Sequence, residues 1–210
     1  YGLYTNKDYG NVRGLELKLD YSFNNLFAQT NYTYQFTRGN ADNAAQTFNR
    51  QGASIDKVIR FIPMSWDQRH TFNVSFGYSA QNFGMSATGY FNSGTPYTFS
   101  PQGESNLALL NLYPNNDYKP SNYHADLSAY FNLPEIFGIK SKLDFLIYNL
   151  TDRFNEYGVS SETGRAYSAV VNETELLSHR SNFNTYEDRY KDPSSFSAPR
   201  QVKATLTIQF

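Results

Sequence analysis

The chain has 210 residues, with 18 basic and 19 acidic side chains and a formal net charge of −1. This even balance supplies no basic surface for nucleic acid, so we expect no nucleic-acid partner. There is no cysteine, which excludes disulfide scaffolds, thiolate metal sites and cysteine nucleophiles. No apolar run approaches the ~20 residues of a membrane helix, although a strand can cross with only ~9–11 residues, alternately apolar.

Seven segments alternate apolar and polar residues with the two-residue period of a strand that has one apolar face. The sixth is the least regular, because Leu146 falls among its polar positions, and the last continues to Phe210, which predicts a strand paired to its end. The pattern predicts an all-β, antiparallel fold. The apolar positions lie within residues 15–21, 28–36, 70–78, 83–91, 125–131, 143–147 and 202–210.

The connections between these segments alternate strictly between short and long. With the predicted bounds they hold about 5, 32, 3, 32, 10 and 50 residues. In an up-and-down arrangement all the short turns then lie at one end and all the long loops at the other, as in outer-membrane barrels. Ten residues at ~3.3 Å each, tilted by ~40°, also span the ~25 Å apolar band of such barrels.

Aromatic residues make up 17% of the chain and gather toward the predicted strand ends. Membrane-spanning strands carry aromatic girdles at these positions, although aromatic residues also favour strands in general. We expect four of them to be membrane-interface anchors: Trp66, Tyr78, Phe83 and Phe210. Seven strands do not close the even-numbered barrel typical of a single bacterial chain, so further strands are expected upstream or in partner chains.

Five stretches carry a resemblance to a known family: PMSWDQRHTFNVSFGY (63–78), SGTPYT (93–98), LDFLIYNLTDRFN (143–155), TGRAY (163–167) and APRQVKATLTIQF (198–210). Taken in order, they resemble the C-terminal part of TonB-dependent outer-membrane receptors, especially those of the Bacteroidota type. The resemblance implies a 22-stranded transmembrane β-barrel filled by an N-terminal plug domain. Residues 1–210 would then supply the last seven strands, with the plug and the first strands outside this chain.

The same resemblance implies a location and a set of partners. The protein would lie in the lipid of the bacterial outer membrane and would engage TonB through an N-terminal region outside this chain. The terminal aromatic, Phe210, matches the signal that the barrel-assembly machinery reads. Some relatives also carry a surface lipoprotein as a lid.

Charged residues of both signs fall on the polar side of the predicted strands, where they would line the barrel interior. An open ion pore tends to carry rings of one sign, whereas mixed signs fit a wall that hydrogen-bonds to an internal plug. The predicted lumen-facing or plug-facing residues are Glu16, Lys18, Asp20, Asp126, Lys142, Asp144 and Lys203.

Ligand contacts are expected from the long loops, where aromatic rings can stack on a sugar, a siderophore or a peptide. The candidates are Tyr97, Tyr113, Tyr118, Tyr157 and Tyr167. Around Trp66, the structural interpretation is favoured over ligand contact: Asp67 and Arg69 are expected to pair beside an interfacial tryptophan.

No catalytic or metal-binding constellation emerges from the sequence. The three histidines, His70, His124 and His179, lie far apart, and phosphate-binding, dinucleotide-binding and nucleophile-elbow motifs are absent. Acidic loop residues lack the spacing of a calcium site and are expected to be solvated: Asp117, Glu187, Asp188 and Asp192. We therefore expect no enzyme activity and no cofactor.

The resulting functional hypothesis is an active transporter that takes up a scarce, large nutrient such as a siderophore, cobalamin, an oligosaccharide or a peptide. A passive porin or structural barrel is the alternative, and a plug domain before the first strand would distinguish the two. A soluble β-sandwich that binds carbohydrate is the third hypothesis, and partition into water without detergent would favour it.

Overall fold

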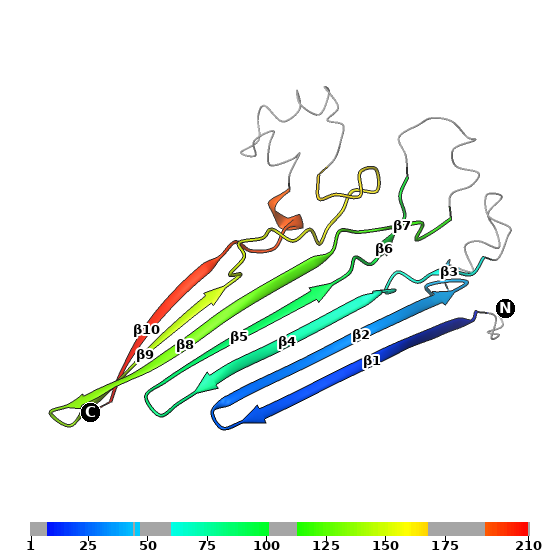
Figure 1. The fold of residues 1–210 in the computed structure, drawn as a ribbon. Coiled ribbons are helices and arrows are strands. Elements are labelled where there is room, and N and C mark those ends of the chain that lie inside the picture. The colour runs from blue at the N-terminus through cyan, green and yellow to red at the C-terminus, as the bar shows by residue number, and fades with distance from the viewer. Residues whose placement is uncertain (1–7, 44, 47–59, 101–112, 168–191, 210) are drawn as a thin grey trace, which may run out of the picture.

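The computed structural model describes residues 8–43, 45–46, 60–100, 113–167 and 192–209. Its main element is one antiparallel sheet in which sequence neighbours are also spatial neighbours (Figure 1). The strands, in spatial order, are β1 (Gly10–Phe23), β2 (Leu26–Gly39), β4 (His70–Ser79), β5 (Phe83–Asn92), β8 (Asn122–Ile136), β9 (Ile139–Tyr148) and β10 (Gln201–Gln209).

Short elements lie outside this series. The two-residue strand β3 (Ile62–Pro63) pairs with β2, and β6 (Pro96–Tyr97) pairs with β7 (Asp117–Tyr118) in a separate small sheet. A 3₁₀ turn, η2, covers Pro193–Ser195. Within the described residues, no helix has the length and apolar character needed to cross a membrane.

The predicted all-β, antiparallel, up-and-down arrangement is confirmed, and the sheet is open. Strands β1 and β10 form its two edges. The short connections, 24–25, 80–82 and 137–138, lie at one end, and the long ones, 40–69, 93–121 and 149–200, lead from the other (Figure 1).

Two of the predicted turns were too long. Strands β1 and β2 are joined by two residues, with Asn24 at φ 49°, and β8 and β9 by Phe137 and Gly138 at φ 53° and 80°. The prediction ended the fifth strand before Pro134, but β8 continues to Ile136. A register shift between Leu133 and Ile136 accommodates the proline, which has no N–H to donate to the ladder.

The strand register unites the apolar sides of all seven main strands on one face. Leu17 pairs with Tyr32, Tyr32 with Phe72, and Phe72 with Phe91, so these residues form a row across four strands. The row continues to Tyr123 on β8. Directly paired residues share a face of the sheet, and successive rows lie on opposite faces. The rows therefore alternate between an apolar face and a polar face.

Aromatic rings flank the apolar face on two sides. The row from Tyr32 to Tyr123 lies toward the loop end, and toward the turn end the ring centroids of Tyr78 and Phe83 are 5.4 Å apart and those of Phe83 and Phe131 6.5 Å. Between them lie a row of smaller side chains, Thr30, Val74, Gly89 and Ala125, and a mixed row that includes Phe76 and Ala87. An apolar band flanked by aromatic residues on both sides is typical of strands that cross a bilayer.

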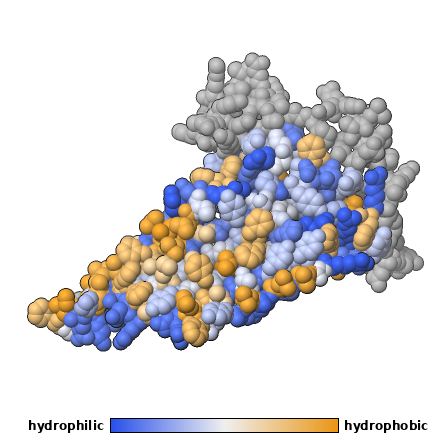
Figure 2. Space-filling model, in the orientation of Figure 1, coloured by the Kyte–Doolittle hydropathy of each residue, from blue (hydrophilic) through white to orange (hydrophobic). Residues whose placement is uncertain are grey.

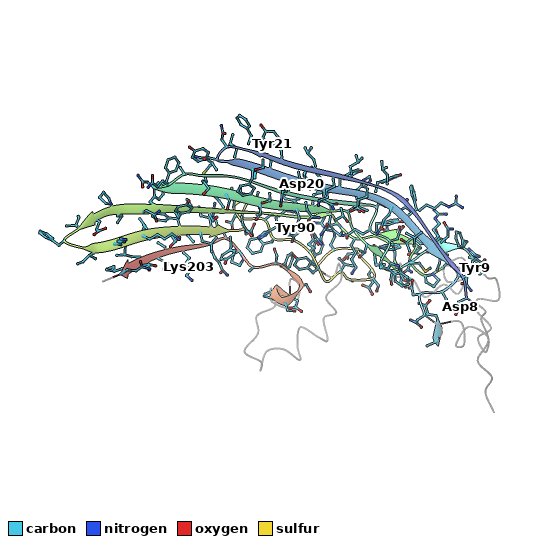
Figure 3. The ribbon with its side chains drawn as sticks, turned by 90° about the horizontal axis from the view of Figure 1, so that it is seen from below. Asp8, Tyr9, Asp20, Tyr21, Tyr90 and Lys203 are labelled. Atoms are coloured by element: carbon cyan, nitrogen blue, oxygen red, sulfur yellow. The ribbon has the colours of Figure 1, made fainter. Side chains whose placement is uncertain are left out.

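The sheet is curved, and its two faces differ in side-chain character. Figure 3 shows an arch with Tyr21 on the convex side and with Tyr90 and Lys203 on the concave side. By register, Tyr21 belongs to the apolar face, and Tyr90 and Lys203 belong to the polar face. The apolar face is therefore convex. Figure 2 shows hydrophobic side chains over the strand region and mainly hydrophilic ones toward the loop end.

No described residue covers the apolar face. Even on the central strands, Phe76 is 49% exposed, Met85 46% and Phe131 43%. The buried side chains lie instead at the loop end, and most of them are polar. The buried apolar residues of the described part are Ile62, Met64 and Ala166, and the buried polar ones are Thr37, Asn40, Asp67, Asn115, Asn149, Asn155 and Glu156.

Candidate functional site

The loop end of the sheet is built around the fully buried carboxylate of Asp67. The backbone N–H of Thr37 donates to its Oδ1 at 2.6 Å, while Arg69 Nε and the Tyr118 hydroxyl donate to its Oδ2 at 2.8 and 3.2 Å. The predicted pairing of Asp67 with Arg69 is confirmed. The Arg69 guanidinium lies 4.2 Å from the ring centroid of Phe36, which adds a cation–π contact.

These contacts fix the protonation of the cluster. Burial by itself lowers the pKa of Arg69, but the hydrogen bond and charge of Asp67 outweigh it and raise the pKa above its usual value. Burial raises the pKa of the Tyr118 hydroxyl, against the lowering influence of Arg69. Near neutral pH, Arg69 is therefore charged and Tyr118 keeps its proton, so each donor in the cluster has a defined acceptor.

Beside this cluster lies a hollow of about 350 Å³, which we call the loop-end hollow. Its walls include three arginines and two tyrosines: Arg38, Arg60, Arg69, Tyr113 and Tyr118. They come from the end of β2, from the two long connections after β2 and β5, and from β7. A volume of this size suits a small molecule or one residue of a larger one.

The base of the third long connection, 149–200, is tied together by two buried asparagines. Asn149, at φ 53°, donates through Nδ2 to the carbonyl oxygens of Arg153 and Ala198. Asn155 accepts from the backbone N–H of Tyr123 and donates back to the Tyr123 carbonyl at 3.0 and 2.8 Å. These bonds join the start of the connection both to its end and to β8.

An ion pair holds the next part of the same connection. Arg165 donates from Nε and Nη2 to the nearly buried carboxylate of Glu156, and the Ala166 backbone N–H donates to the same carboxylate at 2.6 Å. The hydrogen bond from Arg165 lowers the pKa of Glu156, although burial opposes that shift. Glu156 therefore stays ionised well into the acidic range.

All seven residues predicted to face the lumen lie on the polar face of the sheet. Several pair with a neighbour on that face: Lys18 with Asp20 at 3.1 Å, and Lys142 with Asp144 at 2.6 Å. Asn31 donates to Glu16, and His124 contacts Asp126 at 2.6 Å. Charges of opposite sign therefore largely offset one another along this face.

The five tyrosines predicted to contact ligand do not form one group. Tyr113 and Tyr118 both line the loop-end hollow. Tyr97 instead donates to Asp117, Tyr157 shares a hydrogen bond with Tyr90, and the ring of Tyr167 lies beside Arg165. The hollow thus unites two of the candidates, and the other three take part in separate contacts.

The predicted interface anchors lie at both ends of the strands. Tyr78 and Phe83 are on the apolar face at the turn end, where their rings are in contact, and Trp66 is 52% exposed beside the loop end. Phe210 lies outside the described residues. Of the histidines, His70 shares a hydrogen bond with Tyr32, and His179 is outside the described part. No group of potential metal ligands occurs among the described residues.

The fold and site together define an antiparallel, all-β protein with an uncovered apolar face and a polar loop-end core. Comparison with protein families, curated proteins and solved structures gave no match.

Arg38 and Arg60 were not predicted from the sequence to belong to a site, and Arg69 was predicted only to pair with Asp67. Arg38 lies next to the last residue of β2, whereas Arg60 and Tyr113 belong to two different long connections. No motif links these positions along the chain, because their proximity depends on how the long connections fold over the strand ends. The sequence contains one weak signal for this site, which is that Arg38 is a charged residue at the end of an alternating segment without other charges.

Proposed function

We propose that this chain forms part of the wall of a transmembrane β-barrel in the bacterial outer membrane. The observation that carries the proposal is the uncovered apolar face on the convex side of the sheet. Soluble monomers rarely expose continuous apolar patches larger than a few hundred Å², and this face extends over seven strands. Contact with lipid on the convex side removes the unfavourable exposure to water.

The two open edges support the same proposal. Strands β1 and β10 each pair on one side only among the described residues. In hydrocarbon, every unpaired backbone group is destabilising by several kcal/mol, so a lipid-facing sheet must be closed by further strands. In our proposal these strands complete a barrel of 22, with the short turns in the periplasm and the long loops outside the cell.

We further propose that the barrel is a TonB-dependent active transporter of a scarce, large nutrient. Two features favour this over a passive porin. The polar face carries charge pairs that offset one another, which suits contact with an internal plug better than ion conduction. The loop end also has a buried polar core and a hollow suited to ligand binding, features that a non-selective pore does not need.

Conductance in planar lipid bilayers tests the proposal. The complete protein carrying this sequence should insert and remain closed to ions, because a plug fills the lumen. A large, steady conductance would instead identify a passive porin. Partition into the aqueous phase without detergent would identify a soluble β-sandwich and overturn the membrane assignment.

A second experiment tests the energy coupling. In our proposal the complete receptor binds the periplasmic domain of TonB through its N-terminal region, and this binding is measurable by surface plasmon resonance. Assembly is tested separately: deletion of Phe210 should lower the amount of folded protein in the outer membrane, whereas Gln209→Ala should leave it unchanged. Absence of TonB binding in an inserted barrel would exclude active transport by this route.

A further inference from the structure

We infer that the loop-end hollow binds an oxyanion, such as a carboxylate, phosphate or sulfate group, carried by a small molecule. Three arginines contribute to its walls, and none of the described residues that line it is acidic. Arginine presents a planar set of N–H donors that matches the geometry of these groups. Two tyrosine rings beside the arginines supply surface for the body that carries the anion.

The arginines are not equivalent, because Arg69 alone is paired with an acidic side chain among the residues that the structure describes. Arg69 is paired with Asp67 and is held by it. Arg38 and Arg60 are exposed, and the guanidinium group of neither forms a hydrogen bond or an ion pair with any residue that the structure describes. No described side chain therefore occupies these guanidinium donors, and Arg38 and Arg60 are the two residues that we assign to anion binding.

Nearby acidic groups do not occupy these donors. Asp67 is saturated by Thr37, Arg69 and Tyr118. Asp42 accepts from the Ser65 backbone N–H and from Asn115 Nδ2, at 2.8 and 2.9 Å, and it does not line the hollow. Asp42 reduces the local positive potential, yet its oxygens accept from neutral donors and not from Arg38 or Arg60.

The part of the wall formed by Asn115 and Asn116 is preorganised. Asn115 donates to the Pro63 carbonyl as well as to Asp42, which ties the connection after β5 to β3. Asn116 exchanges two hydrogen bonds with the backbone of Phe99. A ligand therefore meets a wall whose polar groups are already fixed, which reduces the entropy lost on binding.

The aromatic side of the hollow is positioned to complement the charge. The Arg60 guanidinium lies 5.8 Å from the ring centroid of Tyr113, within the range of a cation–π contact. A contact with the ring face does not use the N–H donors of Arg60. A flat or sugar-like body could then stack on Tyr113 while its anionic group meets the guanidinium donors.

A lipid headgroup is a second source of the same anionic chemistry. Arg38 and Phe61 also line an adjoining, more apolar hollow of about 790 Å³, to which Arg13 and Tyr34 contribute. The experiment therefore needs arms that separate soluble anions from anionic lipid. The inference that the hollow binds an anion does not depend on the proposed function. The further step, that this anion is the transported nutrient, rests on the proposed function.

Binding of soluble probes by the complete protein tests the inference. Citrate and inorganic phosphate are titrated by isothermal calorimetry into protein held in zwitterionic nanodiscs, with glucose as the neutral probe. We expect citrate and phosphate to bind and glucose not to. Repeating the titration in nanodiscs that contain phosphatidylglycerol measures competition by a headgroup: weaker citrate binding identifies lipid as a second occupant of the arginine site, and unchanged binding identifies a site for soluble anions only.

Substitutions then assign the binding to the two arginines. Arg60→Gln removes a charge-assisted hydrogen bond, so we expect it to bind citrate about tenfold more weakly. The double variant with both Arg38→Gln and Arg60→Gln should lose more affinity. Arg60→Lys should restore part of the affinity, because the charge remains without the planar set of donors. Lys140→Gln is the matched control, since it removes one positive charge at the turn end of β9.

The outcomes separate this inference from the proposed function. A closed barrel that binds TonB but neither anion would overturn the anion site and leave the transporter proposal standing. An open, conducting barrel that binds citrate through Arg60 would overturn the transporter proposal and leave the anion site standing. Equal loss of binding in Lys140→Gln and Arg60→Gln would show a general charge effect and would also overturn the site.

Discussion

The strand region and the loop end of this molecule are organised in opposite ways. Along the strands, large apolar side chains such as Phe76 and Phe131 remain exposed, whereas at the loop end the side chains of Asp67, Asn149 and Asn155 are fully buried. The strands are held by backbone ladders, and the loop end is held by side chains that bond to the backbone of distant segments. The stability of the strand region therefore depends on what contacts its convex side, and the stability of the loop end depends on its internal hydrogen bonds.

The largest effect is expected from breaking the loop-end core at Asn155. Asn155→Ala removes a fully buried amide and leaves the N–H and carbonyl of Tyr123 without their side-chain partners, which should lower the free energy of unfolding by about 2–5 kcal/mol. Urea unfolding of the complete protein in lipid vesicles measures this. Asn132→Ala removes an exposed amide at the turn end and should have little effect; equal losses would contradict the difference between the regions.

The apolar face is tested by placing a charge on either side of one strand. Ala87 lies on the apolar face near the middle of β5, and its neighbour Thr88 lies on the polar face. Lysine near the centre of a bilayer is destabilising by about 2–4 kcal/mol, so Ala87→Lys should reduce stability in vesicles far more than Thr88→Lys. Similar stabilities for the two variants would mean that lipid does not contact the convex side.

A smaller and more local effect is expected at Gly94, in the SGTPYT stretch. A Cβ at this position would lie 1.6 Å from the carbonyl oxygen of Lys119, so the backbone must shift to accept it. We expect Gly94→Ala to disturb the β6–β7 pair and to reduce stability by about 1–3 kcal/mol. Hydrogen exchange should show faster exchange at Lys119, whose N–H bonds to Thr95, while β4 and β5 stay protected. Unchanged exchange at Lys119 would refute this.

The smallest effect concerns the pH dependence of the Glu156–Arg165 pair. Because the pKa of Glu156 is lowered in the folded protein, its stabilising contribution is complete above the ordinary glutamate pKa of about 4.3 and is lost as the pH falls through the folded value. Melting temperatures measured from pH 7 down to pH 3 should decline more steeply for the wild type than for Glu156→Gln. Parallel declines would exclude a contribution from this pair.

The sequence predicted the strands well because a single physical constraint acts along each of them. One apolar and one polar face impose a two-residue period, which is visible in residues such as Phe72, Val74 and Phe76 without any tertiary information. Turn positions were less accurate, since Pro134 normally ends a strand. In β8 a local register shift resolves the conflict, and a register shift leaves no clear pattern in the sequence.

The candidate site was predictable only in part. Aromatic residues in long loops were expected to contact ligand, and Tyr113 and Tyr118 do line a hollow together. The sequence could not select these two from the five candidates, nor add Arg38 and Arg60 to them. Similarly, Asn149 and Asn155 belong to a recognisable stretch, but their burial depends on Tyr123 and Ala198, which lie far away in the chain.

By itself, the sequence determined the fold class, the number of long strands and the alternation of short and long connections. It did so because hydrophobic period and connection length are local properties of a chain. The tertiary structure decided the curvature of the sheet, the union of seven apolar sides into one convex face and the positions of the loop arginines. These features depend on strand register and on hydrogen bonds between distant segments, which no short stretch of sequence encodes.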